Sequence, residues 1–422
     1  MKIAFILSKF PSISETFIIN QIVGLIKSGQ KVKIFAEFDP KEKYVHPDVL
    51  KYNLLKDTFY YKPKNKIFRV FKIFAMVLKN FFVNPAPLFF TAKSFIQKSL
   101  AYSPKITFLR LWLNLKWNYL VLPEFLSEKF DIVHCHFGPN GIIGIKLKQF
   151  GVRCKIITSF HGDDANSIPR IYGRDIYKEL FSNCDCFTAN TNFTKNNIVQ
   201  LGCSSLLIDI IPVGLKIEEF QYIPRHFNTG DRIKILTVGR LVEKKGHFYA
   251  IQAISKLINI YNNVEYIIVG DGPLKPFLQR FAEKKGISEH VTFLGNLDQE
   301  KIVEIYRSAH IFVLPSVTAR NSDREGQALV LQEAQLMGLP VISTLHNGIP
   351  DGVLDGKSGF LVPEKDVDAL VEKLIYLIKN PTLWDAIGTA GRMFVESRYD
   401  INILNDNLIR VYKKTLSKQK LV

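Results

Sequence analysis

Short apolar runs alternate with longer amphipathic ones along most of this chain, and this alternation is the feature that most constrains its fold. In the second half, five apolar runs indicate strands: Lys234–Val238, Val264–Val269, Val291–Leu294, Ile311–Leu314 and Pro340–Ser343. Four intervening stretches have helical periodicity: His247–Ile260, Leu274–Lys285, Gln299–Ala309 and Ala328–Met337. Strands and helices in alternation predict a parallel sheet that is covered by helices on both faces.

The first half repeats the pattern less regularly. Its expected strands are Lys2–Leu7, Lys31–Glu37, Asp131–Phe137, Lys155–Phe160, Cys186–Asn190 and Ile208–Val213. A helix is expected over Glu15–Ser28, directly after the first strand, with Ser14 as its N-cap. A basic segment of helical character, at about 59–126, interrupts the pattern as an insertion.

The domain organisation follows from this pattern. A chain of 422 residues suffices for two or three domains, and Pro212–Asp231 is the expected linker. We predict an α/β protein with two Rossmann-like, doubly wound domains that face each other across a cleft. The expected boundaries are 1–212, which includes the insertion, 213–398, and 399–422 for a final helix that packs back on the N-terminal domain. Ligands of such sheets bind outside the carboxyl ends of the strands.

The positive charge of the chain is concentrated in one segment. The net charge is +17, which indicates a polyanionic partner. Between Phe59 and Leu120 there are eleven Lys or Arg residues and no acidic residue, among many Phe and two Trp. This mixture suits contact with an anionic lipid surface, and a solvated basic face over a core is the alternative. No recognisable nucleic-acid-binding module is present, so no nucleic acid is expected as a partner.

The sequence also carries expectations about the cellular setting. The N-terminal apolar run Ile3–Leu7 is too short for a signal peptide, and no apolar run approaches the ~18 residues of a membrane-spanning helix. Five cysteines without framework spacing suit a reducing compartment. Cys184 and Cys186 lack the spacing and the second pair of a zinc site, so we expect ordinary core thiols. These features predict a cytoplasmic protein, peripheral on the inner face of the bacterial membrane.

The stretch "VGRLVEKKG", Val238–Gly246, follows the first strand of the second half. Gly239 ends the strand and permits a close approach of the backbone. Arg240 and Lys245 then offer two cations beside the start of a helix, which is a favourable place for a phosphate. A basic surface loop is the alternative interpretation.

Two glutamates, Glu325 and Glu333, flank an apolar segment in "DREGQALVLQEAQLMGLP". With a helix expected from about Ala328, Glu325 lies near its start and Glu333 about two turns inside it, and eight helical residues rise about 12 Å. That separation argues against a glycosidase-type pair, whose carboxyl groups flank one bond at about 5–9.5 Å. The two carboxylates would instead address different ends of one elongated ligand.

Several other strand ends carry polar residues. After the next strand comes "HNGIPDGV", in which Gly348 lets backbone N–H groups turn toward a ligand. In the first half, "SFHGDD" places His161 at a strand end, which favours a catalytic over a structural role. "HCHFG" has the same appearance, but we expect a packing or loop role for His136. In "FPSISETF", Ser14 and Thr16 could donate hydrogen bonds to a phosphate or a sugar.

These stretches together resemble the retaining glycosyltransferases of the large family 4, which have the GT-B fold. In the second half the resemblance is carried, in order, by "VGRLVEKKG", "VGDGPL", "VTFLG", "LPS", "EGQALVLQEAQLMGLPVIST", "NGIPDGV" and "SGFLVP". "FPSISETFI", "HCHFG" and "SFHGDD" are similar to the branch that builds exopolysaccharide (colanic-acid type), capsule or O-antigen repeat units. The rest of the first half is weakly matched.

The resemblance implies a role for each matching position. Arg240 and Lys245, beside Gly239, match the pair that neutralises the donor diphosphate. Glu333 matches the glutamate that holds the ribose hydroxyls, and Glu325 the one near the donor sugar and the reacting centre. His161 matches the histidine of the reaction centre. The remaining implied contacts are the backbone of Gly326, Gln327, Ala328 and Gly348 for the donor, and Ser14, Glu15, Thr16 and Asp164 for the acceptor or sugar.

Two positions depart from the family pattern. Gln327 stands where an aromatic or apolar residue is frequent, and Asp351 stands where Glu is frequent. Both changes could alter the choice of donor. Neither removes a charge that the implied scheme needs.

The function implied is transfer of a sugar, with retention, from a nucleotide-sugar donor that is UDP- or GDP-linked. The implied acceptor is a polyprenyl-diphosphate-linked glycan in cell-surface polysaccharide biosynthesis. We expect neither cofactor nor metal, because Arg240, Lys245 and helix N-termini can stabilise the leaving diphosphate and no Asp-x-Asp motif stands at a plausible donor site. The alternatives are a nucleotide-sugar epimerase of the same fold and a non-catalytic protein that docks on membranes.

Overall fold

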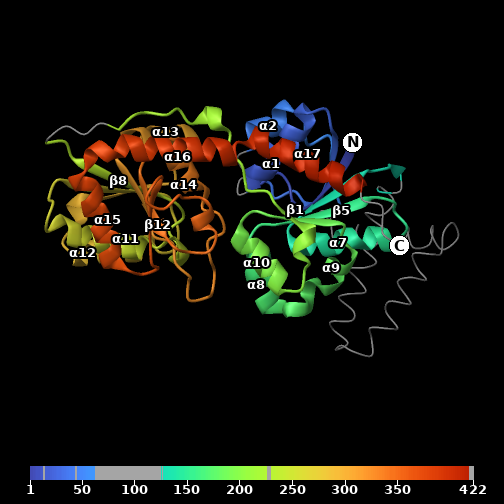
Figure 1. Cartoon of the computed structure of the whole chain (residues 1–422), viewed down its shortest axis with the longest axis horizontal. Helices are drawn as coiled ribbons and strands as arrows, with labels where there is room; N and C mark the ends of the chain where they lie inside the picture. The colour runs from blue at the N-terminus through green and yellow to red at the C-terminus, as the bar shows by residue number, and fades with distance from the viewer. Residues whose placement is uncertain (13–14, 43–44, 62–124, 126, 226–229, 418–422) are drawn as a thin grey trace. The chain divides into compact units, whose positions relative to one another are not determined.

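The structure is a computed structural model that describes the chain except for residues 13–14, 43–44, 62–124, 126, 226–229 and 418–422 (Figure 1). Contacts divide the described chain into two compact units. The first comprises Met1–Ser159, Tyr177–Phe187 and the chain from Ile409, and the second comprises Phe160–Ile176 and Thr188–Leu408. The expected insertion, and with it most of the basic segment 59–120, lies outside the described residues.

Seven strands form the first sheet, in the order β3-β2-β1-β4-β5-β6-β7. The strands are β1 (Lys2–Lys9), β2 (Lys31–Phe38), β3 (Thr58–Tyr60), β4 (Ile132–His136), β5 (Lys155–Phe160), β6 (Cys186–Ala189) and β7 (Ile208–Ile210). The α-helices between them are α1 (Thr16–Lys27), α2 (Pro47–Lys51), α7 (Gly138–Gln149), α8 (Asp163–Tyr172), α9 (Lys178–Asn183) and α10 (Asn192–Gln200). The pairs β1–β2, β1–β4, β2–β3 and β4–β5 are parallel.

Six strands form the second sheet, in the order β10-β9-β8-β11-β12-β13, and every neighbouring pair is parallel. The strands are β8 (Ile233–Val238), β9 (Val264–Val269), β10 (Val291–Gly295), β11 (Ile311–Leu314), β12 (Val341–Thr344) and β13 (Gly359–Val362). The helices are α11 (His247–Ile258), α12 (Lys275–Lys284), α13 (Gln299–Ser308), α14 (Leu329–Leu336), α15 (Val367–Lys379), α16 (Trp384–Tyr399) and α17 (Ile401–Ser417).

Both faces of the second sheet are buried, which explains why its strands are continuously apolar. Ile235 and Leu236 are neighbours in β8, yet they belong to separate hydrophobic clusters because their side chains point to opposite faces. One cluster includes residues of α11, α12 and α15, and the other includes residues of α13, α14 and α16. Figure 1 shows these two sets of helices on opposite sides of β8 and β12.

The strand order of the second sheet reverses between β8 and β11. The chain proceeds from β8 outward through β9 to β10, and then returns to place β11 on the other side of β8. In open parallel sheets, ligands bind at the carboxyl ends of the strands at such a reversal. The loops that follow β8 and β11 are therefore the first place to look for a site.

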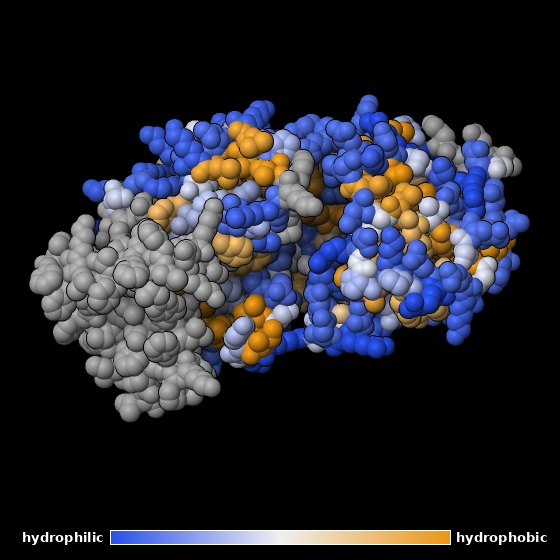
Figure 2. Space-filling view, turned by 180° about the vertical axis from the view of Figure 1, so that it is seen from behind, coloured by the Kyte–Doolittle hydropathy of each residue, from blue (hydrophilic) through white to orange (hydrophobic). Residues whose placement is uncertain are grey.

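The sequence-based fold is confirmed: the chain is α/β with two Rossmann-like parallel sheets. Two strands were missed, β3 and β13, which have three and four residues. Within the described residues, no helix is both long and apolar enough to cross a membrane. On the face in Figure 2, hydrophobic residues form separate orange patches in a largely blue surface.

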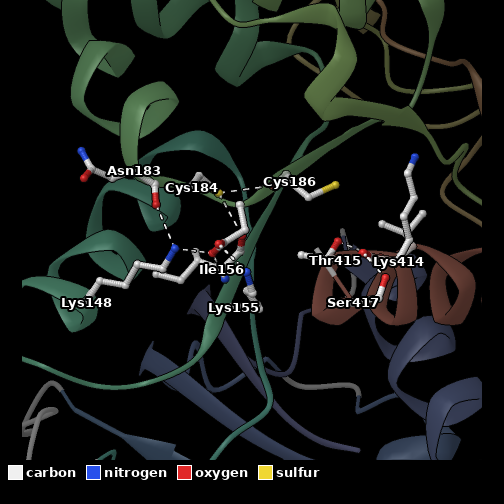
Figure 3. A network of polar contacts seen from close by, with 11 residues as sticks. Lys148, Lys155, Ile156, Asn183, Cys184, Cys186, Lys414, Thr415 and Ser417 are labelled. Carbon is white, nitrogen blue, oxygen red and sulfur yellow. Dashed lines mark hydrogen bonds and ion pairs between the residues drawn. The ribbon is translucent and has the colours of Figure 1, made fainter. Parts of the chain in front are cut away.

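The thiols of the Cys184 region are core groups of the first unit. The Cys184 thiol lies 3.2 Å from the Ile156 carbonyl and 3.3 Å from the Cys186 carbonyl (Figure 3). Burial raises the pKa of Cys184 to about 12, so the thiol is protonated at neutral pH. Among the described residues no group of His, Cys, Asp and Glu could hold a metal ion.

Beside this thiol, the carboxylate of Asp185 forms ion pairs with Lys148 and Lys155 and accepts a hydrogen bond from the Ile156 backbone N–H at 2.8 Å. The ion pairs compensate its partial burial.

The end of α17 is fixed in the first unit by a buried hydrogen-bond network. His134, in β4, is bonded through Nδ1 to the Tyr412 hydroxyl at 2.7 Å and through Nε2 to the Ser159 hydroxyl at 2.6 Å. His136 is also buried, and its ring stacks on Phe5 with the centroids 5.5 Å apart.

Arg225 donates hydrogen bonds to the C-terminal carbonyls of two helices in the second unit. Its side chain is 5% exposed and donates to the carbonyls of Arg307 (2.5 Å), Ala309 (3.2 Å) and Met337 (2.5 Å). These carbonyls lie at the C-termini of α13 and α14, where helical carbonyls lack intrahelical partners and attract cations. Burial lowers the pKa of Arg225 to about 10, so the side chain remains charged at neutral pH.

We expect Arg225→Met to destabilise the second unit by on the order of 3 kcal/mol, because two buried carbonyls and one partly buried carbonyl lose their donors. The measurement is the urea midpoint and the melting temperature. Arg232→Met is the matched control, since Arg232 is exposed and donates to one carbonyl, that of Glu289, at 3.3 Å. Equal losses in the two variants would contradict this role of Arg225.

Candidate active site

The loop after β8 carries the two predicted cations in different environments. The Lys245 side chain runs over Gly239, where a Cβ, if glycine had one, would lie 3.5 Å from the lysine Cδ. Gly246 has φ +71°, and a Cβ there would lie 1.8 Å from the Pro315 carbonyl oxygen, so only glycine allows this loop to touch the loop after β11. Arg240 is exposed and forms no ion pair with any residue that the structure describes.

Lys245 and Glu325 meet at the reversal of the strand order. The Lys245 Nζ lies 2.5 Å from the Glu325 Oε2, and each side chain is 12% exposed. Burial alone would raise the pKa of Glu325, but the charge of Lys245 and its hydrogen bond outweigh burial, and the pKa is lowered. Glu325 is therefore ionised at neutral pH, and the predicted site contains an ion pair between Lys245 and Glu325.

Glu333 is held at the same site by a tyrosine. The Tyr306 hydroxyl, from α13, donates to the Glu333 Oε2 at 3.0 Å. Burial raises the pKa of Glu333 to about 7, while the Tyr306 hydrogen bond and the charge of Lys245 act in the opposite direction. Lys245 thus acts electrostatically on both glutamates.

The expected separation of 12 Å along a helix axis does not apply, because the residues from Glu325 to Glu333 are not all helical. Helix α14 begins at Leu329, so Glu325 lies in the preceding loop and Glu333 is in the second turn. Ala328 is the N-cap and has the left-handed angles φ 57° and ψ 60°, which an alanine adopts only where the surroundings enforce them. This sharp turn separates the Glu325 loop from the helix.

Gln327 has a structural contact that its sequence did not reveal. Its side chain is 4% exposed and forms two hydrogen bonds with the backbone of Val213. The Val213 N–H donates to Oε1 at 2.7 Å, and Nε2 donates to the Val213 carbonyl at 2.8 Å. An aromatic or apolar side chain could not form this pair, so the departure at Gln327 anchors the expected linker to the site loop.

Two loops that follow β5 and β6 lie against Gly326 within the second unit. Asn190 Nδ2 donates to the His161 carbonyl at 3.2 Å, and a Cβ on Gly326 would lie 3.1 Å from the same oxygen. A Cβ on Gly348 would lie 2.3 Å from the Gly326 carbonyl oxygen. The structure therefore brings His161, Gly326 and Gly348 together, as the sequence predicted for residues of one site.

His161 and Asp164 differ in what they offer a ligand. Burial lowers the pKa of His161 to about 3, so its imidazole is neutral at pH 7. Asp164 is buried, and its Oδ1 accepts hydrogen bonds from the backbone N–H groups of His161 (2.9 Å) and Gly162 (3.0 Å). Asp164 thus shapes the loop that presents His161.

Asp351, the second departure from the family pattern, caps α10. Its carboxylate accepts hydrogen bonds from the Asn192 backbone N–H at 2.5 Å and from the Asn192 side chain at 2.9 Å. The Tyr399 hydroxyl donates to the Asp351 carbonyl at 2.7 Å. The shorter aspartate is therefore accommodated by contacts with α10.

The remaining predicted contacts belong to the first unit. Glu15 is the N-cap residue of α1 and lies 3.8 Å from the Lys9 Nζ, and Thr16 begins the helix. Ser14 lies outside the described residues.

Sequence reasoning missed several residues that build the site. Lys244, which was not singled out, binds Asp323 at 3.0 Å and so ties the loop after β8 to the Glu325 loop. His346 and Glu364 lie in the quoted stretch after β12 and just after "SGFLVP", yet neither was selected. Their signal was position alone, because each lies two residues after the end of a strand.

Comparison with known proteins identifies the family. A family model described as "Glycosyl transferases group 1" matches residues 219–394, and one described as "Glycosyltransferase Family 4" matches residues 93–219. WcaL of Escherichia coli K12, which carries the name of a colanic acid biosynthesis glycosyltransferase, is 32% identical over 89% of this chain and 90% of its own. The chain belongs to this glycosyltransferase family. The glycosyltransferase prediction is thereby confirmed.

Other relatives agree with this assignment. The amylovoran biosynthesis glycosyltransferase AmsK of Erwinia amylovora is 31% identical over 98% of this chain and 100% of its own. A GDP-mannose-dependent phosphatidylinositol monomannoside mannosyltransferase of Mycolicibacterium smegmatis is 29% identical over 63% of this glycosyltransferase and 72% of its own chain.

Solved structures confirm the GT-B fold. Anabaena HepE in complex with UDP and glucose has a TM-score of 0.66 at 16% identity, with 98% of this chain and 100% of HepE covered. The lipopolysaccharide outer core galactosyltransferase WaaB has a TM-score of 0.69 at 19% identity, with 98% and 99% covered.

The raised pKa of Glu333 predicts a pH-dependent stability. Because the folded state holds this proton more tightly than the unfolded chain, the protonated carboxyl is stabilising below its ordinary pKa of 4.5, and this contribution is lost as pH rises through about 7. Glu333→Gln should therefore raise the melting temperature of the ligand-free glycosyltransferase at pH 8 and change it little at pH 5. Glu283→Gln, at an exposed position, is the control. An equal gain at both pH values would contradict the prediction.

Proposed function

We propose that this glycosyltransferase moves a sugar, with retention of configuration, from a UDP- or GDP-linked donor to a polyprenyl-diphosphate-linked glycan during bacterial exopolysaccharide assembly. The observation that carries the proposal is Lys245, held beside Glu325 and acting on Glu333 at the reversal of the strand order. The names of WcaL and AmsK support the pathway class. HepE binds UDP, and the mycobacterial relative depends on GDP-mannose. The proposal therefore includes both uridine and guanosine diphosphate sugars as donors.

The site chemistry suits departure of a diphosphate. As the bond from the anomeric carbon to the diphosphate oxygen breaks, negative charge accumulates on that oxygen, and nearby cations stabilise it. Lys245 is already oriented by Glu325, and Arg240 is an exposed cation in the same loop. We propose that these two residues bind the diphosphate without a metal.

The remaining residues position the sugar and its nucleoside. The acceptor oxygen would bond to the anomeric carbon from the face that the diphosphate leaves, and its proton would pass to the departing diphosphate. A neutral His161 can donate one hydrogen bond and accept another at the sugar. The Glu333 carboxyl group would bind the ribose hydroxyls.

The two glutamates should have separable kinetic phenotypes. Glu325→Ala should lower kcat about 10- to 100-fold, because Glu325 orients Lys245 and addresses the sugar. Glu333→Ala should mainly raise the donor KM, by about tenfold or more. The measurement is transfer from nucleotide sugars to a lipid-linked acceptor, with EDTA present to test metal independence. Full activity in both variants would contradict the assigned site.

We also propose that the enzyme is peripheral on the inner face of the cytoplasmic membrane, through the basic segment 59–120. The support is the sequence, with its eleven basic and no acidic residues. Lys/Arg→Gln changes across 62–79 should weaken binding to anionic vesicles, and added salt should weaken binding of the parent protein. Unchanged vesicle binding at low salt would contradict this proposal. The matched control has six Lys→Gln changes at exposed positions outside this segment, namely Lys256, Lys284, Lys285, Lys379, Lys413 and Lys414.

A further inference from the structure

His346 connects the loop after β12 to the main chain of Glu325. Its side chain is fully buried, and its Nε2 faces two N–H groups. The Glu325 backbone N–H donates to Nε2 at 3.1 Å, and the Asn347 side chain lies 2.7 Å from the same atom. On its other side, the His346 Nδ1 lies 2.6 Å from the Glu364 Oε1.

Glu364 joins the ends of three consecutive strands. It follows β13, its Oε1 binds His346 after β12, and its Oε2 accepts a hydrogen bond from the Thr318 backbone N–H, after β11, at 2.8 Å. Burial alone would raise the pKa of Glu364, but the hydrogen bonds from His346 and Thr318 outweigh burial, and the pKa is lowered. An anionic carboxylate at this position requires a hydrogen on the His346 Nδ1.

These contacts determine the protonation state of the imidazole. With the hydrogen on Nδ1, the lone pair of Nε2 is free to accept the Glu325 N–H. The opposite tautomer, or a doubly protonated ring, would place two hydrogens face to face. Burial lowers the pKa of His346, opposed by Glu364 and Glu325 and assisted by Arg324, so the ring is neutral at pH 7.

We propose that Glu364 and His346 are positioning residues for catalysis: the carboxylate selects the Nδ1–H tautomer of His346, and the ring holds the main chain of Glu325 at Lys245. This inference rests on the proposed function only for the role of Glu325. The structural contacts that motivate it are independent of the donor and the acceptor. A histidine that merely stabilises the loop is the competing explanation.

Kinetics distinguish positioning from mere loop stability. His346→Met removes the acceptor, and kcat should fall about 10- to 100-fold with a small change in donor KM. His346→Gln keeps an acceptor oxygen near the place of Nε2 and should recover most of that loss. His310→Met is the matched control, because His310 accepts the Lys234 backbone N–H at 2.9 Å at the opposite end of β8. The control should lose stability without losing kcat.

A double-mutant cycle tests whether His346 acts through Glu325. If it does, His346→Met should lower kcat by less than about threefold when Glu325 is already Ala, since coupled residues are not additive. Multiplicative losses would overturn the proposal. So would a His346→Gln variant as slow as His346→Met, provided that both fold.

Nitrogen NMR of labelled histidine tests the tautomer without any activity. At pH 7 the His346 signal, assigned by its absence in His346→Gln, should show a protonated Nδ1 and an unprotonated Nε2. Glu364→Gln should shift the tautomer population toward Nε2–H. An Nε2–H or doubly protonated ring in the parent protein would overturn the proposal. If no lipid-linked acceptor is glycosylated, the proposed function fails, but this spectrum still tests the tautomer that Glu364 is inferred to select.

Discussion

The ion pair between Lys245 and Glu325 is the contact on which the rest of the site depends. The two charges lie 2.5 Å apart with little exposure, and a partly buried charge without its partner would be costly. The pair forms only if the loops after β8 and β11 touch, which Gly246 permits at the Pro315 carbonyl. A donor diphosphate would enter beside a lysine whose partner already holds it in place, so little reorganisation is needed when charge develops.

Neighbouring loops satisfy the polar groups that this arrangement buries. Gln327 pairs with the backbone of Val213, and Asp164 accepts two backbone N–H groups of the His161 loop. Glu364 and His346 do the same for Thr318 and Glu325. The contacts of Gln327, His346 and Glu364 link different strand-end loops, so the site is held by side chains on a rigid sheet.

Sequence reasoning selected strand-end residues, some of which meet in the structure, but it misjudged the geometry between others. Lys245 and Glu325 were assigned to one site, and the structure brings them into contact. The helical spacing of Glu325 and Glu333 failed because Ala328 turns the chain before α14 begins. His346 and Glu364 were missed because neither has a motif of its own. The role inferred for them depends on their hydrogen bond to each other and on the backbone N–H groups that they accept.

Periodicity is a local property, and the sequence alone therefore determined most of the strands, several of the helices and the parallel, doubly wound class. Family motifs added the loops that are predicted to carry the chemistry. Only the tertiary structure decided which side chains meet, because the strand order joins loops that lie about 20 to 115 residues apart, as with His346 and Glu325 or Val213 and Gln327. The protonation states of Glu333, His161 and His346 were decided there too, since burial and the nearest charges set each pKa.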